Sequence, residues 1–429
     1  MDFVHASLLS PGSILVAVVT VVFLLIRAWP LPPKKDKLAT LATSDHVPSR
    51  HVSVSKEPDV PEGWYRSQEV FELERRALFS KSWVYLAHTA QFIKPGAYQS
   101  FDLAGFPVFL IRGKDNKIRA FHNVCRHRAY TITRKETGAS TVLGCRYHGW
   151  SYDTLGQLVK APQFEDIPGF EKSENSLFEI HTHTTEQGWV FVNLDAGEPA
   201  PRNESTFGAL NDFARGAKLR MKSEWIAGQT LTGTFNWKLG ASARQFDVVA
   251  ARLEQKISEA MKPSIATRIV RAFIQNNNKA DCSVFPGTFL YSFEKADLWL
   301  SLTFLPSSET STRVRYDLFA PASKAGMDEN SLANAAGEVI QNAINAIEAQ
   351  YQSTIEEPVE NSTTTHEILK QLQEHQKLER VSGGLVRPAM RQPKGSALFQ
   401  QAEQLCKELD CSGPGSQAGS GSSSSRLDW

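Results

Sequence analysis

The chain has 429 residues, 41% of them hydrophobic, which is enough for two or three domains with apolar cores. Its formal net charge of +1 gives no reason to expect nucleic acid as a partner, and five cysteines are an odd and sparse set for a secreted disulfide scaffold. The composition therefore argues against a polyanion-binding protein and against a disulfide-dense extracellular module.

An apolar stretch lies near the N-terminus. Residues 8–26 are almost continuously apolar, which is close to the roughly 20 residues that a helix needs to span a bilayer. No Lys or Arg precedes this stretch, whereas Arg27 and Lys34 follow it. This pattern predicts an uncleaved anchor helix over residues 1–30, with the bulk of the chain in the cytosol and the endoplasmic reticulum as the favoured membrane. A buried helix or a signal peptide is the alternative, because the span is short.

A polar linker and a small β-domain are predicted next. Residues 31–62 are rich in Ser, His, Pro and Lys and lack an apolar period. Ser67 is placed to cap a short helix, and the sequence then changes to short strands. Residues 113–117 and 153–156 have the composition of hairpin turns between apolar runs. These features predict a globular, all-β domain over residues 63–195.

Two motifs inside this domain carry metal-binding residue types. Cys125 and His127 form a Cys-x-His pair, and Cys145 and His148 form a Cys-x-x-His pair. Two thiolates and two imidazoles on two loops are the ligands of a [2Fe-2S] cluster that has cysteines on one iron and histidines on the other. Zinc is the main alternative, but zinc ligands usually come as a Cys pair followed by a His pair. One Cys and one His from each loop therefore favour the iron-sulfur cluster.

Two tyrosines refine the type of cluster. Tyr130 and Tyr147 stand where a disulfide between the two loops would need cysteines. The disulfide-clamped, high-potential variety is therefore not expected. The sequence predicts a cluster at the low end of the Rieske potential range.

The surroundings of the motifs resemble a known family. His122-Asn123 before the first motif, Cys145-Arg146-Tyr147-His148-Gly149-Trp150 at the second and Trp189–Leu194 after it are similar to the Rieske domain of ring-hydroxylating oxygenase alpha subunits, in the choline monooxygenase-like branch. The resemblance is close from about Gly63 to Asp195. It implies an electron-donating reductase or ferredoxin, a homo-oligomer, and an α+β helix-grip (START-like) domain whose mononuclear Fe(II) activates oxygen beside the substrate.

The second half of the sequence mixes helices and strands. Apolar residues recur at helical spacing at Phe246, Val249, Leu253, Ile257 and Met261. Strands are predicted over residues 281–291, 298–305 and 313–319. Ser331 is placed to cap one later helix, and another is expected to start near Thr365. The helix-grip domain is therefore predicted over residues 204–400, and the Ser/Gly-rich segment 401–429 is predicted to be largely disordered.

The ligands that the resemblance implies for the mononuclear iron are missing. They are expected shortly after the landmark Asn236-Trp237-Lys238, yet no histidine occurs between His183 and His366. Val249 and Glu254 stand where two of the ligands would fall. Because a valine side chain cannot replace an imidazole as a ligand, a normal 2-His-1-carboxylate site is not encoded there.

No other residues supply an obvious substitute. Ala349 stands where the late carboxylate is expected, and Asp247 is most simply part of a solvated helical face. His366 and His375 lie about two and a half helical turns apart, too far for one ion, and are expected to be exposed. The catalytic residues are therefore unknown, and the mononuclear Fe(II) is doubtful.

Two main hypotheses remain for function. The first is a membrane-tethered Rieske oxidoreductase that hydroxylates a hydrophobic small molecule with O2 and reductase-supplied electrons. The second is an electron-transfer or redox-sensing protein that has kept the cluster and lost oxygen activation. In a third reading the cluster only supports folding. The family resemblance favours the first hypothesis, and the residues after Lys238 favour the second.

Overall fold

A computed structural model describes residues 60–199, 201, 204–217, 219, 223–241, 243–260, 281–293, 298–321, 328–353 and 362–388. All of them lie in the compact unit Glu57–Trp429. The anchor predicted at residues 1–30, nearly all of the linker at 31–62 and the tail at 401–429 lie outside the described residues. Of the helices that are described, none has the length and apolar character needed to cross a bilayer.

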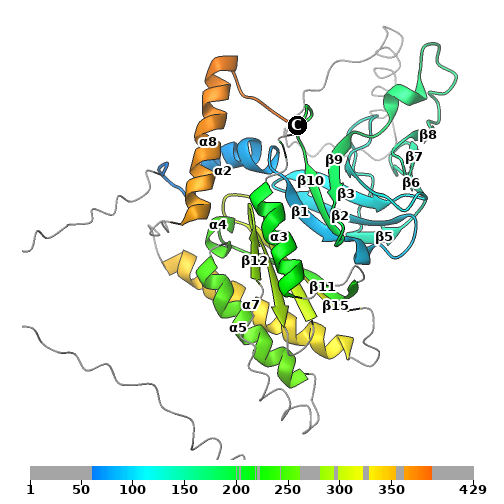
Figure 1. Ribbon diagram of the computed structural model, residues 1–429. Coiled ribbons are helices and arrows are strands. Elements are labelled where there is room, and N and C mark those ends of the chain that lie inside the picture. Colours follow the sequence, from blue (N-terminus) through cyan, green and yellow to red (C-terminus); the bar gives the residue numbers. More distant parts are fainter. Residues whose placement is uncertain are drawn as a thin grey trace, which may run out of the picture. The chain divides into compact units, whose positions relative to one another are not determined.

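A seven-stranded antiparallel sheet forms the N-terminal part, with the strand order β1-β10-β9-β4-β3-β2-β5 (Figure 1). Its strands are β1 (Val84–His88), β2 (Ala97–Leu103), β3 (Phe106–Arg112), β4 (Ile118–His122), β5 (Thr137–Ala139), β9 (Glu179–Thr184) and β10 (Trp189–Asn193). Three short helical turns accompany it: η1 (Arg75–Phe79), η2 (Thr89–Gln91) and η3 (Lys172–Asn175). The predicted β-rich character of this part is confirmed.

Two local predictions can be compared with this part. Helix α2 (Gln68–Glu74) begins after Ser67, whose hydroxyl accepts a hydrogen bond from the Val70 amide, as predicted. The apolar run 101–111, which precedes the predicted turn at 113–117, does not form one strand, because Ala104 and Gly105 have positive φ and turn the chain from β2 into β3. Alanine rarely adopts this left-handed conformation, so Gly105 is the clearer signal for the turn in the sequence.

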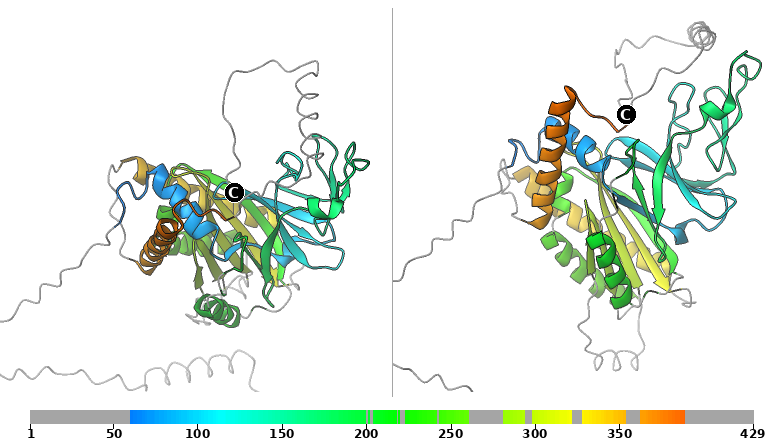
Figure 2. Two further views of the ribbon diagram at one scale, coloured as in Figure 1. Left: turned by 90° about the horizontal axis from the view of Figure 1, so that it is seen from above. Right: turned by 45° about the horizontal axis from the view of Figure 1, so that its top comes forward.

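A three-stranded sheet of β6 (Val142–Gly144), β7 (Ser151–Asp153) and β8 (Leu158–Lys160) carries the second Cys-His motif. The predicted hairpin at 153–156 joins β7 to β8. Gly156 is required there, since its φ is +76° and a Cβ atom would lie 2.4 Å from the Phe121 ring. Helix α8 (Thr363–Ser382) is the last of the described helices and packs against η1 (Figures 1 and 2).

The C-terminal part is α+β, as predicted. Its five-stranded antiparallel sheet has the order β11-β15-β14-β13-β12. The elements are α3 (Glu204–Gly216), β11 (Ser223–Gly233), α4 (Trp237–Gly240), α5 (Ala243–Ala260), β12 (Asp281–Val284), β13 (Thr288–Phe293), β14 (Leu298–Pro306), β15 (Thr312–Pro321) and α7 (Glu329–Ser353). Helices α5 and α7 pack against each other, and α7 packs on β11.

Three predictions for this part need correction. The run 281–291 is two strands, since residues 285–287 separate β12 from β13. Helix α7 is capped by Asp328 and not by Ser331, because the Asp328 carboxylate accepts the Ser331 amide at 3.2 Å. Both residue types cap helices well, so their order alone does not choose between them. His375 is not exposed; only 6% of its surface is accessible.

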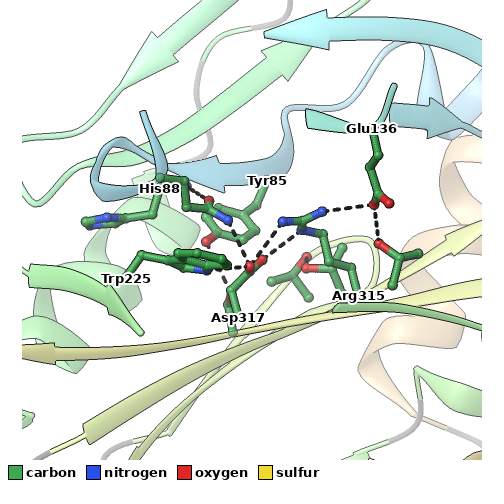
Figure 3. Close-up of polar contacts among 11 residues, drawn as sticks. Tyr85, His88, Glu136, Trp225, Arg315 and Asp317 are labelled. Carbon is green, nitrogen blue, oxygen red and sulfur yellow. Dashed lines mark hydrogen bonds and ion pairs between the residues drawn. The ribbon is translucent and has the colours of Figure 1, made fainter. Parts of the chain in front are cut away.

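A buried carboxylate on β15 joins the two large sheets (Figure 3). Asp317 accepts hydrogen bonds from Gln91 Nε2 at 2.8 Å and from Trp225 Nε1 at 2.9 Å. Arg315 Nε donates to its other oxygen at 2.8 Å. Gln91 comes from η2 of the N-terminal part, whereas the other two donors come from the C-terminal sheet. Asp317 therefore ties the two parts together.

The segment between the two Cys-His motifs reaches the same junction. Glu136 accepts from Thr230 Oγ1 at 2.7 Å and lies 3.4 Å from Arg315 Nη1 (Figure 3). Three residues before Glu136, Thr133 is held by Asn123, which precedes the first motif and whose side chain bonds both the amide and the carbonyl of Thr133, at 2.9 Å each. The long segment between the motifs is thus held near its middle, at Thr133 and Glu136.

Candidate metal centre

The first Cys-His motif lies in a closed six-residue loop, loop 1 (residues 125–130). The Cys125 amide donates to the Tyr130 carbonyl at 2.8 Å, and the Ala129 amide donates to the Cys125 carbonyl at 2.8 Å. Ala129, the fifth residue, has a φ of +55°. This left-handed residue turns the chain back, so that the loop begins and ends at the same place.

The second motif repeats this arrangement in loop 2 (residues 145–150). The Cys145 amide donates to the Trp150 carbonyl at 2.7 Å, and the Gly149 amide donates to the Cys145 carbonyl at 3.0 Å. Gly149 is again the fifth residue and has a φ of +73°. The two loops therefore share one backbone scheme, although they share little sequence beyond Cys-Arg and the histidine.

The structure brings the two predicted thiols together. Cys125 and Cys145 are both buried and hydrogen bond to each other. This bond lowers the pKa of Cys145 to about 6, helped by the backbone amides of Tyr147 and His148, while it raises the pKa of Cys125, together with burial. A pair of adjacent buried sulfur atoms with one readily ionised member is suited to binding one metal ion.

The structure also brings the two predicted imidazoles together, with ring centroids 4.6 Å apart. Their surroundings differ. His127 is only 2% exposed, and its ring stacks on Trp150 at 5.0 Å with an interplanar angle of 10°. His148 is partly exposed and lies 3.9 Å from the Tyr147 ring. One imidazole is therefore part of the core and the other lies near the surface.

Tyr152 adds a contact that sequence reasoning does not single out. Its hydroxyl lies 3.2 Å from Cys125 Sγ and accepts the Arg126 amide at 3.1 Å. Because an amide hydrogen occupies one lone pair, the hydroxyl hydrogen is available to the sulfur. Burial raises the pKa of Tyr152, so this group stays protonated. The available signal was its place in the predicted strand after the second motif, where a buried tyrosine needs a polar partner.

The two thiols are adjacent, and so are the two imidazoles. A Rieske [2Fe-2S] cluster requires this pairing, because each of its irons has two protein ligands. Tyr130 and Tyr147 pack together at a centroid distance of 5.2 Å, and Cys125 and Cys145 are free thiols. An aromatic pair therefore stands where a disulfide-clamped cluster would have its cross-link.

The segment in which the sequence lacks ligands for a second iron site is apolar in the structure. Val249 and Leu253 of α5 are buried in the main hydrophobic core, with 7% and 0% of their surface exposed. Glu254 is partly exposed, and the side chain of Asp247 lies outside the described part. Outside loops 1 and 2, the described ranges contain no group of three or more His, Cys, Asp or Glu side chains that could hold a metal ion.

The other candidates have structural roles. Glu74 forms a buried ion pair with Lys238 and accepts Trp237 Nε1 at 2.8 Å, so the Asn-Trp-Lys landmark fastens α4 to α2. His375 Nε2 lies 3.3 Å from Glu379 and 3.2 Å from the Val386 carbonyl. His366 is exposed, so the two histidines of α8 form no common site.

Comparison with known proteins places these observations in a family. The Rieske [2Fe-2S] domain family matches residues 82–171. The oxygenase subunit of carnitine monooxygenase from Acinetobacter pittii is 33% identical over 187 residues, which cover 42% of this chain and 50% of that protein. The alpha subunit of benzene 1,2-dioxygenase from Pseudomonas putida is 37% identical over 132 residues, which cover 30% of this chain and 29% of that protein. The chain thus spans half the length, or less, of these curated relatives.

Solved structures show the same fold. A quaternary ammonium Rieske monooxygenase in complex with L-carnitine matches with a TM-score of 0.54 and 22% identity, covering 68% of this chain and 84% of that one. Naphthalene 1,2-dioxygenase matches with a TM-score of 0.54 and 19% identity, covering 68% of this chain and 80% of that one. Residues 82–171 are therefore a Rieske [2Fe-2S] domain, and the matched part of the chain is similar to the alpha subunits of ring-hydroxylating dioxygenases and to the oxygenase subunits of carnitine monooxygenases.

Proposed function

We propose that this protein is a Rieske-type electron-transfer oxidoreductase. Cys125, His127, Cys145 and His148 would hold the [2Fe-2S] cluster, which supplies reversible one-electron chemistry when bound. A reductase or ferredoxin would reduce it, and the electron would leave to an acceptor outside the protein's own C-terminal part. The predicted potential range, without a disulfide clamp, suits a donor of this kind.

The observation that carries this proposal is the apolar character of α5. Val249 and Glu254 stand where the family's oxygen-activating iron would need ligands; Val249 is 7% exposed, Glu254 is partly exposed, and Leu253 beside it is fully buried. Aliphatic side chains have no lone pairs, and a divalent ion left without ligands in such surroundings would be strongly disfavoured. The electron therefore has no recognisable destination on this helix.

The decisive measurement is iron and acid-labile sulfide per chain, together with an EPR spectrum of the reduced protein. Two irons and two sulfides with a Rieske-type signal are expected. Cys125→Ser, which removes one thiolate, should lose both irons and the signal. One zinc without sulfide would contradict the proposal.

Hydroxylation of a hydrophobic small molecule is the second candidate. It is favoured by the names of the relatives, which are monooxygenases and dioxygenases. Under this alternative a third iron per chain should survive gel filtration, and reduced protein should consume O2 in step with an apolar substrate. Two irons and no coupled O2 consumption would leave only the electron-transfer function.

We also propose that the protein is tethered to a membrane by residues 1–30, with the linker 31–62 leading to a cytosolic Rieske domain at 63–195 and a helix-grip domain at 204–400. The support is the apolar run that ends at Ile26 and the basic residues after it. Alkaline carbonate extraction should leave the full chain in the membrane pellet. Complete release into the supernatant would refute the tether.

A further inference from the structure

The C-terminal end of helix α8 exposes several apolar side chains. This region, here named the α8 tip, is formed by Lys377, Leu378, Arg380, Val381 and Leu385, all of them exposed. Val381 is 87% exposed, Leu385 59% and Leu378 46%. Single exposed apolar residues are common on protein surfaces, but three of them within eight residues form a patch that needs an explanation.

The backbone of the α8 tip is fixed. Gly383 ends the helix with a φ of +68°. The chain then turns back (Figure 1), and the Val386 amide donates to Glu379 Oε1 at 3.2 Å. Two residues later, the Pro388 carbonyl accepts the Ala196 amide at 3.0 Å. A Cβ atom added to either glycine of the turn would meet no atom within 4 Å. The tip is therefore a held projection with open space around it, and not a loose end of the chain.

The charge of the tip is positive. The tip and the turn after it carry three basic residues, Lys377, Arg380 and Arg387, and one acidic residue, Glu379. The Glu379 carboxylate is engaged in an ion pair with η1 at 2.7 Å. The next acidic residue, Glu374, lies three positions before Lys377. Basic residues also suit the C-terminal end of a helix because of its dipole, but the dipole does not account for the apolar residues between them.

Apolar side chains among basic ones suit the surface of a bilayer that contains anionic lipids. Apolar side chains can enter the boundary between headgroups and acyl chains, and lysine and arginine are attracted to the lipid phosphates. The long stems of the basic side chains can follow the apolar residues inward while their charges stay at the headgroups. The composition of the tip therefore matches the two layers that a protein meets at a membrane surface.

The proposed tether favours a bilayer over another protein as the occupant. More than thirty residues separate Ile26, where the apolar run ends, from Val60, the first described residue. A flexible linker of this length has an end-to-end distance of about 30 Å, which exceeds the radius of gyration of about 20 Å for a folded unit of this size. The tether would therefore keep the folded unit beside the bilayer without deciding which face meets it.

We propose that the α8 tip is a second membrane contact, whose three apolar side chains enter the headgroup boundary of an anionic bilayer. Lys377 and Arg380 would contact the lipid phosphates. This inference rests on the proposed tether. The contact lies on the surface and does not cross the bilayer, in keeping with the length and polarity of the described helices. It would restrict the orientation of the tethered unit, and it would weaken at high salt or without anionic lipid.

The experiment uses the full chain with its cluster, reconstituted into phosphatidylcholine vesicles with about 30% phosphatidylserine. The photo-crosslinking amino acid p-benzoylphenylalanine replaces Val381, and mass spectrometry detects attached lipid after irradiation. The matched control has the same probe in place of Ile93, which is 84% exposed and lies beyond the end of β1 that is farther from η1 and α8. The Val381 probe should give at least about fivefold more lipid adduct than the Ile93 probe.

A charge reversal tests the basic residues of the tip. Lys377→Glu combined with Arg380→Glu should lower the lipid adduct of the Val381 probe by at least about threefold, and vesicles without phosphatidylserine should lower it similarly. Lys114→Glu combined with Lys117→Glu makes the same change of charge in the exposed hairpin turn at 113–117 and should change the adduct by less than about 1.5-fold. Retention of the EPR signal shows that each variant is folded and loaded.

Two results would overturn the proposal. The first is an equal yield of lipid adduct from the Val381 and Ile93 probes, or a yield that does not depend on anionic lipid. The second is crosslinking of the Val381 probe mainly to protein, because the tip would then be covered by a second copy or by another chain.

Alkaline carbonate extraction of the same vesicles separates failure of the tether from failure of the tip contact. Complete release into the supernatant refutes the proposed tether. Protein that stays in the membrane pellet without a lipid adduct at the Val381 probe refutes only the contact at the α8 tip.

Discussion

Loops 1 and 2 have the same backbone and opposite surroundings. Both are closed by the same two hydrogen bonds, and both turn at a fifth residue with positive φ. Yet loop 1 carries its histidine at the third position, where it is 2% exposed, and loop 2 carries it at the fourth, where it is partly exposed. One backbone scheme thus presents one imidazole to the core and the other toward solvent, so cluster binding and packing can be tested separately.

The largest expected effect is loss of the cluster from either loop. His127→Ala and His148→Ala should both abolish the Rieske EPR signal, because each iron needs both of its protein ligands. The cluster-free variants should then differ. His127→Ala should cost about 3 kcal/mol of unfolding free energy through the cavity it leaves, and His148→Ala less than about 0.5 kcal/mol. Urea unfolding checks this, and equal losses of stability would contradict the comparison.

The second-largest expected effect concerns the aromatic rings that pack beside the two histidines. Trp150 is fully buried and packs on His127, Phe164 and Phe170, so Trp150→Leu should lower the unfolding free energy by about 3 kcal/mol. Tyr147, its counterpart, is exposed. Tyr147→Leu should therefore lower the unfolding free energy by less than about 0.5 kcal/mol. Thermal unfolding of both variants measures the difference. A larger cost for Tyr147→Leu would mean that loop 2 is also packed from its outer side.

The fifth residue of each loop gives a smaller effect. Gly149→Ala places a Cβ at a φ of +73°, where the nearest atom would be Pro162 Cγ at 3.4 Å. The cost is therefore mainly backbone strain, about 1 kcal/mol. Ala129→Gly relieves the corresponding strain in loop 1 but makes the unfolded chain more flexible, so stability should change by less than about 0.5 kcal/mol. Denaturant midpoints test the pair; a large loss in Ala129→Gly would show that its methyl group matters more than its φ.

The smallest effect is on the electron affinity of the cluster. Both thiols interact with backbone amides of their own loop, and Cys125 in loop 1 has the Tyr152 hydroxyl at 3.2 Å in addition. Tyr152→Phe removes a hydrogen bond worth about 1 kcal/mol and should lower the one-electron reduction potential by about 40 mV. A redox titration followed by EPR measures it. An unchanged potential would mean that the hydroxyl serves only the Arg126 amide.

Sequence reasoning succeeded for local structure: the cap at Ser67 and the turn at 153–156 follow from local residue types. The structure brings together the four Cys and His residues of the two short motifs, and their role as cluster ligands stays a prediction. Family resemblance then indicated the order of a β-rich part and an α+β part. The apolar character of Val249 could also be foreseen, because its side chain can neither bind a metal nor stay in water at low cost.

Long-range packing could not be foreseen in the same way. Ala104 gives no hint of the turn between β2 and β3, and the burial of His375 depends on Glu379 and the Val386 carbonyl folding back over it. The different exposure of His127 and His148 depends on Phe164, a residue outside both motifs. Such contacts depend on which segments meet in space, and no local pattern records that.

The junction at Asp317 has a consequence for the Rieske half taken alone. Its carboxylate is 2% exposed and takes hydrogen bonds from η2 and from the C-terminal sheet, and Gly228 has no room for a Cβ, which would lie 2.1 Å from it. Without the C-terminal half, Gln91 would lack Asp317 as its hydrogen-bond acceptor. Trp189, which packs against Trp299, would be exposed to water. The C-terminal half therefore covers buried side chains of the Rieske half, whether or not it holds an iron of its own.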